Sequence, residues 1–211
     1  MNQVIIEDTI KRYPKLYQCS EQIKMACQTI INCYENNGKV LVCGNGGSAS
    51  DSEHIVGELM KGFLMKRPLN QEHKAKLVQY IDQNDQYLIE KLQYGLPAIS
   101  LVNHNSLVTA VSNDNHGDLI FAQQVLGFAK ENDILIGLST SGNSKNVVLA
   151  FSVAKALNLK TIALTGLNGG KLKDLSDILI AVPETETYKV QELHLPVYHA
   201  ICAVVEQYFF G

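Results

Sequence analysis

Five short runs of hydrophobic residues recur along the chain, and each is apolar at nearly every position. The runs are residues 39–43, 98–102, 134–138, 161–165 and 178–182. A strand that is hydrophobic on both faces is typical of a parallel sheet that helices cover on both sides. The pattern therefore predicts five buried strands at the centre of the fold.

Apolar residues at helical spacing fill the intervals between these runs. The predicted helices are residues 50–63, 106–111, 119–129, 145–157 and 188–210, and residues 1–37 form a mainly helical N-terminal region. Strands that alternate with helices form a parallel, doubly wound sheet. We therefore predict an α/β fold, a five-stranded parallel sheet flanked by helices, in a single domain that spans residues 1–211.

Residues 66–97 interrupt the alternation of strands and helices. This segment is polar and charged, and it carries Leu77, Tyr80, Ile81, Leu88 and Leu92 at helical spacing. We predict a helical insertion of one or two helices. The sequence leaves three roles open: the insertion covers the site, mediates assembly, or is a peripheral addition.

The composition of the chain argues against several classes of protein. A chain of 211 residues with 46% hydrophobic residues can bury a core without disulfides or a structural metal. The net charge is −3 and no basic stretch is dense, which argues against a nucleic-acid partner. The five cysteines include no CxxC pair and are predicted to be buried thiols. No signal peptide and no apolar run of roughly 18 residues is present, so we expect a cytoplasmic protein without membrane contact.

A glycine-rich loop follows the first strand directly. The loop comprises Asn45, Gly46, Gly47 and Ser48. Its N–H groups and the positive end of the next helix can hold an anion. Gly44, Gly46 and Ala49 also fit the G-x-G-x-x-A pattern of a dinucleotide site. That pattern needs an acidic residue about 20 positions on, at the end of a second strand, whereas Glu72 lies in the insertion.

A second loop, between an apolar strand and a helix, is rich in hydroxyl groups. The hydroxyls belong to Ser139, Thr140, Ser141 and Ser144. One or two hydroxyls satisfy an ordinary helix N-cap, so four in this place favour a loop that holds phosphate oxygens. Ligands of such sheets bind beyond the carboxyl ends of the strands, which is where both loops are expected.

His54 and Glu58 lie four residues apart on the helix after the glycine-rich loop, and this spacing places both on one face. A solvated helix pair explains the spacing on its own. The same two side chains can also move a proton beside a sugar carbonyl or bind a divalent metal. Their position just beyond a phosphate-like loop favours a functional role.

The motifs GNGGS and STSGNS, each after a buried strand, resemble those of the SIS (sugar isomerase) domain family, and more closely its phosphoheptose isomerase subgroup. The resemblance runs from residue 38 to residue 209, apart from the insertion. It implies a five-stranded parallel sheet, an aldose–ketose isomerase that takes a phosphorylated sugar, and a homotetramer.

The resemblance also implies roles for single residues. Glu58 and His199 match the acid/base pair, and Asn113 with Asp114 matches a pair that contacts the sugar. Gln191 matches a further substrate contact. One zinc ion per subunit is expected at His54, Glu58, Gln191 and His199.

A geometric difficulty accompanies this zinc site. Gln191 and His199 are eight residues apart, which is about 12 Å along a straight helix. Sharing one small site then requires long side chains or a bend, which Pro196 can supply.

The predicted activity is the conversion of sedoheptulose 7-phosphate to D-glycero-D-manno-heptose 7-phosphate through an enediol. Tyr188 stands where the family often has an acidic residue, which leaves another phosphosugar open as the substrate. Some SIS proteins, including one that partners the replication initiator, bind without catalysis and lack the acid/histidine pair. Glu58 and His199 favour an enzyme here, and a nicotinamide dehydrogenase is a more distant alternative.

Overall fold

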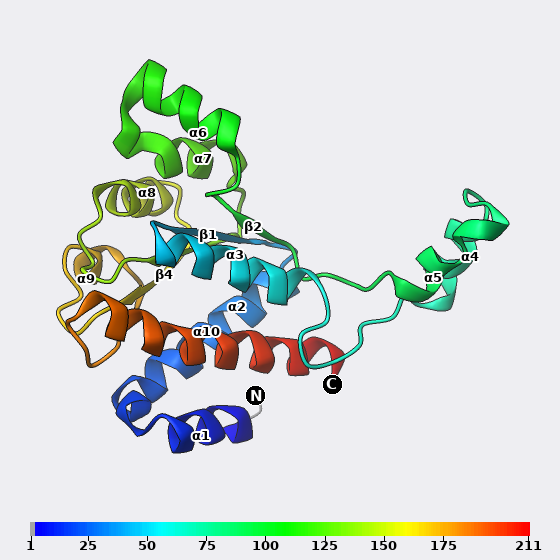
Figure 1. Cartoon of the computed structure of the whole chain (residues 1–211), viewed down its shortest axis with the longest axis horizontal. Helices are drawn as coiled ribbons and strands as arrows, with labels where there is room; N and C mark the ends of the chain where they lie inside the picture. Colours follow the sequence, from blue (N-terminus) through cyan, green and yellow to red (C-terminus); the bar gives the residue numbers. More distant parts are fainter. Residues whose placement is uncertain (1–2) are drawn as a thin grey trace.

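A single parallel sheet forms the centre of the computed structural model, which describes residues 3–211. Its strands are β1 (Val40–Gly44), β2 (Ala98–Ser100), β3 (Ile134–Leu138), β4 (Lys160–Thr165) and β5 (Ile178–Ala181). They lie in the order β2-β1-β3-β4-β5, and every neighbouring pair is parallel (Figure 1). The predicted five-stranded sheet is confirmed, with bounds that differ by one or two residues.

Helices cover both faces of the sheet. One face packs against α1 (Gln3–Arg12), α2 (Ser20–Glu35), α3 (Gly47–Met60) and α10 (Thr187–Phe210). The other face packs against α7 (Ile120–Phe128), α8 (Lys145–Ala156) and α9 (Leu172–Leu175), and α6 (Asn105–Val111) lies outside α7 (Figure 1). Short turns of other helix types span Pro14–Cys19, Ser112–His116 and Gly117–Leu119.

Alternate residues of each central strand enter opposite layers of the core. Val40 and Val42 of β1 belong to the layer with α2 and α10, whereas Leu41 and Cys43 belong to the layer with α7 and α8. This two-sided burial explains why the strands read as continuous hydrophobic runs. All five cysteines are free and buried, as predicted.

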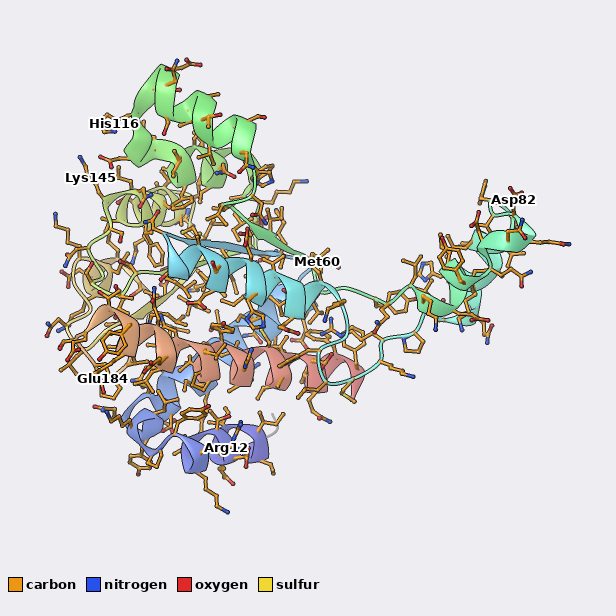
Figure 2. All side chains as sticks on the ribbon, in the orientation of Figure 1. Arg12, Met60, Asp82, His116, Lys145 and Glu184 are labelled. Atoms are coloured by element: carbon orange, nitrogen blue, oxygen red, sulfur yellow. The ribbon has the colours of Figure 1, made fainter. Side chains whose placement is uncertain are left out.

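The insertion forms an arm that projects from the body (Figure 1). It contains α4 (Gln71–Val78), the turn Gln83–Asp85 and α5 (Tyr87–Lys91), and none of these elements has a buried residue. At its root the N–H of Tyr94 donates to the carbonyl of Arg67 at 2.8 Å. Figure 2 places Asp82 at the tip and Met60, the last residue of α3, near the root. The arm therefore leaves from the end of α3 that is remote from the glycine-rich loop.

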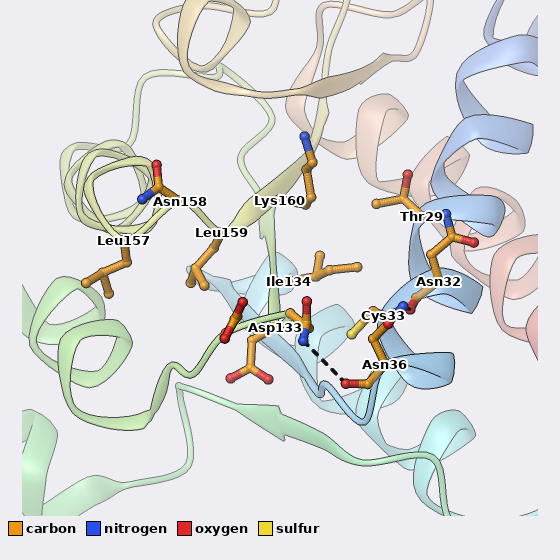
Figure 3. Close-up of a pocket in the computed structure, with 12 residues that line it drawn as sticks. Thr29, Asn32, Cys33, Asn36, Asp133, Ile134, Leu157, Asn158, Leu159 and Lys160 are labelled. Atoms are coloured by element: carbon orange, nitrogen blue, oxygen red, sulfur yellow. Dashed lines mark hydrogen bonds between the residues drawn. The ribbon is translucent and has the colours of Figure 1, made fainter.

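A pocket of about 580 Å³ lies at the amino ends of the strands, opposite the carboxyl ends that the two phosphate loops follow (Figure 3). Asn32 and Cys33 of α2, Asp133 before β3 and Lys160 of β4 line it. Both predicted phosphate loops follow the carboxyl ends of the strands. This pocket is thus separate from the candidate site.

His194 is fully buried on α10, and burial lowers its pKa to about 4. An unfolded chain binds a proton at an ordinary histidine pKa near 6.5, whereas the native state does not. The free energy of unfolding therefore falls as the pH drops from 6.5 towards 4, by about 3 kcal/mol from this group alone. We expect His194→Leu to lose that part of the slope, measured by urea unfolding between pH 7 and 4.5. If the dependence of the unfolding free energy on pH were unchanged in this variant, His194 would not be its source.

Candidate active site

The glycine-rich loop fits closely between β1 and α3. Gly46 has φ +55°, a conformation that glycine adopts without strain. A side chain at Gly47 would come within 2.5 Å of Nε2 of Gln191. The loop therefore brings its backbone N–H groups, the start of α3 and the amide of Gln191 together.

The two predicted phosphate loops are joined by a pair of amide side chains. Asn45 donates to Oδ1 of Asn146 at 2.8 Å, and Asn146 donates back to Oδ1 of Asn45 at 2.9 Å. Asn146 lies in the first turn of α8, just after the hydroxyl-rich loop. The structure thus brings both loops to one edge of the sheet, as the sequence predicted.

The hydroxyl-rich loop is held by its own side chains. The hydroxyls of Ser139 and Ser144 lie 2.9 Å apart, and the N–H of Asn143 donates to Oγ of Ser141 at 3.1 Å. Ser139 is buried, Thr140 and Ser144 are half-buried, and Ser141 is exposed. Of the four hydroxyls, those of Thr140 and Ser141 are therefore the most available to a ligand.

Gly142 sets the shape of the hydroxyl-rich loop, because it has φ +66° and a Cβ there would lie 2.0 Å from the carbonyl oxygen of Gly169. A left-handed conformation costs a non-glycine residue roughly 1–2 kcal/mol, and the backbone clash adds to it. We expect Gly142→Ala to raise KM for a sugar phosphate about tenfold, measured by steady-state kinetics. Gly127→Ala is the control, because its Cβ meets nothing within 4 Å. Equal KM values in both variants would contradict the role of the loop.

Three titratable side chains meet between α3 and α10. Nε2 of His54 lies 3.1 Å from Oε1 of Glu58 and 3.4 Å from Nε2 of His199. The side chain of Glu58 is 14% exposed and that of His54 is 43% exposed. Among the described residues, Oε2 of Glu58 is buried and forms no hydrogen bond, although Nζ of Lys61 lies 3.8 Å from it as an ion pair. His199 also lines a pocket of about 380 Å³ with Asp8, Arg12 and other residues. The cluster thus combines an unsatisfied carboxylate oxygen with access to open space.

The environment of His199 favours its neutral form. Burial and the neighbouring His54 lower the pKa of His199, although Glu58 acts in the opposite direction. A neutral imidazole can both donate and accept a proton. His199 is therefore suited to proton transfer between two oxygens near neutral pH.

Two residues that sequence reasoning missed support this cluster. The hydroxyl of Tyr198 donates to Oδ1 of Asp51 at 3.0 Å and lies 3.0 Å from Nδ1 of His54. Asp51 is one helical turn before His54, and Tyr198 directly precedes His199. The spacing of Asp51 and His54 was visible in the sequence, but their joint contact with Tyr198 depends on the packing of α3 against α10.

Three of the four predicted zinc ligands lie together, and the fourth lies elsewhere. Gln191 lies beside Gly47, whereas His54, Glu58 and His199 meet farther along the two helices. Pro196 does not interrupt α10, which stays helical from Thr187 to Phe210. Within residues 3–211, no three His, Cys, Asp or Glu side chains already form a metal-holding group.

The three clustered residues are nevertheless of the types that bind zinc, His nitrogen and Glu oxygen. Ligand atoms of a tetrahedral zinc with bonds near 2.0–2.1 Å lie about 3.3 Å apart. Two of the three pairs, His54–Glu58 at 3.1 Å and His54–His199 at 3.4 Å, are close to that spacing. The buried Oε2 of Glu58, which forms no hydrogen bond, provides a further donor atom for a metal.

Asn113 and Asp114 lie on an exposed turn of π-helix at residues 112–116. The amide of Asn113 donates to Asp114 at 2.8 Å. Figure 2 shows His116, the last residue of this turn, on the same side of the molecule as Lys145 at the start of α8. The pair is thus placed on the α8 side of the sheet, whereas the histidine cluster lies between α3 and α10.

Comparison with known proteins identifies the family of the chain. A family model described as SIS domain matches residues 8–87 and 88–166. The phosphoheptose isomerase of Helicobacter pylori strain P12 is 39% identical over 92% of this chain and 88% of its own length. That of Akkermansia muciniphila is 34% identical over 100% of this chain and 96% of its own length.

Solved structures show the same fold. A phosphoheptose isomerase from Francisella tularensis superposes with a TM-score of 0.76 at 32% identity and covers 95% of this chain and 94% of its own. The phosphoheptose isomerase of Neisseria gonorrhoeae gives a TM-score of 0.75 at 30% identity with the same coverage. None of the helices in the described part of this chain has the length and hydrophobicity that a bilayer crossing needs. The chain belongs to the SIS domain family and, within it, to the phosphoheptose isomerases.

Proposed function

We propose that this chain is an aldose–ketose isomerase that converts sedoheptulose 7-phosphate to D-glycero-D-manno-heptose 7-phosphate. The observation that carries the proposal is the buried oxygen of Glu58 that forms no hydrogen bond, beside His54 and His199, with the Lys61 ammonium 3.8 Å away. A carboxylate with a free oxygen is a base, and a neutral histidine next to it can move a second proton.

The reaction needs two proton transfers and no net oxidation. Glu58 takes a proton from C1 of the ketose, and the electrons of that C–H bond form the C1–C2 double bond while O2 gains a proton. The enediol then loses a proton from O1, and Glu58 returns its proton to C2. His199 carries the proton between O1 and O2, which suits a group that is neutral near pH 7.

The loops and the acid/base cluster are spaced for an elongated substrate. Ser139, Thr140, Ser141 and Ser144 would hold the phosphate, with Gly46, Gly47 and Ser48 at the start of α3. From Gly47 to His54, α3 rises about 10 Å, and helix side chains lean towards the N-terminus. Such a separation supports an open-chain sugar with its phosphate at the far end from the reacting carbons.

Zinc is a proposed cofactor of this cluster. His54, Glu58 and His199 would hold it, and Gln191 would have to swing away from Gly47 to join them. Bound zinc would polarise the sugar carbonyl as a Lewis acid.

We also propose that the protein is a cytoplasmic homotetramer. The pocket beside His199 is lined partly by Ile5, Phe63 and Ala203 and partly by polar residues that include Asp8 and Arg12, so only part of its wall is apolar. A subunit contact there would shield the reacting carbons from water. The mass from light scattering tests the assembly: four times 23.3 kDa is expected, and the mass of a monomer would contradict it.

An activity screen tests the function. The protein is incubated with sedoheptulose 7-phosphate and, separately, with shorter ketose phosphates, with and without a chelator, and the aldose products are separated by chromatography. Turnover of the heptose phosphate above the others is expected, and loss of turnover with the chelator would support zinc. No turnover of any ketose, even with added zinc, would overturn the proposal and favour a phosphosugar-binding module.

A further inference from the structure

We propose that Asp51 and Tyr198 are positioning residues that fix the tautomer of His54. They form a hydrogen-bonded chain from Asp51 through the Tyr198 hydroxyl to Nδ1 of His54, with both separations 3.0 Å. The chain lies on the side of the imidazole away from Glu58 and His199. The role of this hydrogen-bonded chain in catalysis rests on the proposed function. The tautomer of His54 does not depend on that function.

The direction of the chain follows from counting protons. An ionised carboxylate only accepts hydrogen bonds, and a tyrosine hydroxyl has one proton to donate. Tyr198 therefore gives its proton to Asp51 and can only accept at its oxygen from His54. Nδ1 of His54 must then carry the proton, and in the neutral ring Nε2 carries the lone pair.

This tautomer determines which ions the cluster can bind. Nε2 of His54 faces Oε1 of Glu58 at 3.1 Å and Nε2 of His199 at 3.4 Å. With the proton on Nδ1, the lone pair of His54 and the carboxylate oxygen of Glu58 are two acceptors turned to each other. A cation or a shared proton between them would bind both acceptors. The Asp51–Tyr198 pair thus prepares this face of His54 for a metal ion or a transferred proton.

The hydroxyl of Tyr198 can be separated from the packing of its ring. The ring is 2% exposed and lies in the core, with its centroid 5.4 Å from that of His54 in an edge-on contact. Tyr198→Phe keeps this packing and removes only the hydroxyl. Tyr208→Phe is a matched control, because Tyr208 is also on α10 and also donates to a carboxylate, that of Glu35, outside the cluster.

The test uses the full-length protein labelled with ¹⁵N in its histidines and freed of metal. Two-bond nitrogen–proton correlation spectra report which ring nitrogen of His54 is protonated, and a His54→Asn sample assigns the signal. We expect Nδ1–H in the wild type and in Tyr208→Phe. In Tyr198→Phe we expect a shift to Nε2–H, because that proton can then bond to Glu58.

Zinc affinity and kinetics give an independent readout. Loss of an outer partner of a metal-binding histidine typically lowers metal affinity or activity by about 10- to 100-fold. We expect that loss in Tyr198→Phe, measured by competition with a chromophoric chelator and by kcat/KM, and no change in Tyr208→Phe. A shifted tautomer in a protein that isomerises no ketose would uphold the inference and reject the proposed function.

Asp51→Ala provides a second variant in case Tyr198→Phe does not fold. Without the carboxylate, the Tyr198 hydroxyl is free to donate to Nδ1 of His54, so Nε2–H is again expected. His54 in the Nε2–H form in the wild type, or in the Nδ1–H form in both variants, would overturn the inference.

Discussion

Replacing Glu58 by glutamine lowers kcat by about 10²- to 10⁴-fold, the range that a positioned general base contributes. The amide has nearly the same shape but cannot take a proton from carbon. KM for the sugar phosphate changes little, because the phosphate loops at residues 44–48 and 139–144 lie outside the cluster. Steady-state kinetics with sedoheptulose 7-phosphate, together with direct binding of the substrate, measures both quantities.

The control for this substitution is Glu53→Gln. Glu53 is on the same helix but exposed to solvent, so the same chemical change there should leave kcat unaltered. Full activity in Glu58→Gln would remove Glu58 from the reaction. A loss of substrate binding as large as the loss of kcat would instead assign Glu58 to binding rather than to proton transfer.

The sequence was sufficient to locate those parts of the site that depend on local pattern. Strands β1 and β3 are buried on both faces, so their hydrophobic runs and the loops after them were visible without a structure. Parallel strands end at one edge, which placed the two loops together. The spacing of His54 and Glu58 likewise predicted one helix face, and the structure places them 3.1 Å apart.

The contacts that pattern did not predict join residues far apart in the chain. Asn45 pairs with Asn146, and Tyr198 joins Asp51 to His54, and each contact requires a particular packing of helices. In addition, α10 stays helical through Pro196, and Gln191 lies beside Gly47. Hydrophobic periodicity predicts which face of a helix is buried, but it does not predict which residues of a neighbouring helix that face contacts.

Arg67 makes the clearest example of a contact that the sequence pattern did not predict. It stands at the start of the polar insertion, yet its side chain is 0% exposed and pairs with Glu206, which is 1% exposed. Arg67 also donates to the carbonyls of Leu59 at 2.6 Å and Glu58 at 3.1 Å. Glu206 accepts the N–H groups of Phe63 and Leu64 at 2.8 and 2.7 Å. The pair thus binds the end of α3, the loop after it and α10 to one another.

Breaking this pair should be the most destabilising single change outside the hydrophobic core. Arg67→Met keeps most of the side-chain volume but leaves the Glu206 carboxylate buried without its cation, and such a loss costs about 3–5 kcal/mol. Chemical unfolding at a fixed protein concentration measures the change. The exposed pair of Lys76 and Glu72 on α4 is the control, because Lys76→Met there should cost less than about 1 kcal/mol.

The Arg67 variant also tests how the base is held. The guanidinium is the donor to the backbone carbonyl of Glu58, so its loss frees the last turn of α3 and lets the carboxylate leave His54. We therefore expect kcat to fall in Arg67→Met even where the protein is fully folded, while KM, set by the distant phosphate loops, stays near the wild-type value. Stability close to wild type would show that backbone N–H groups alone satisfy Glu206. A wild-type kcat in the folded variant would show that the packing of α3 against α10 holds Glu58 without help from the ion pair.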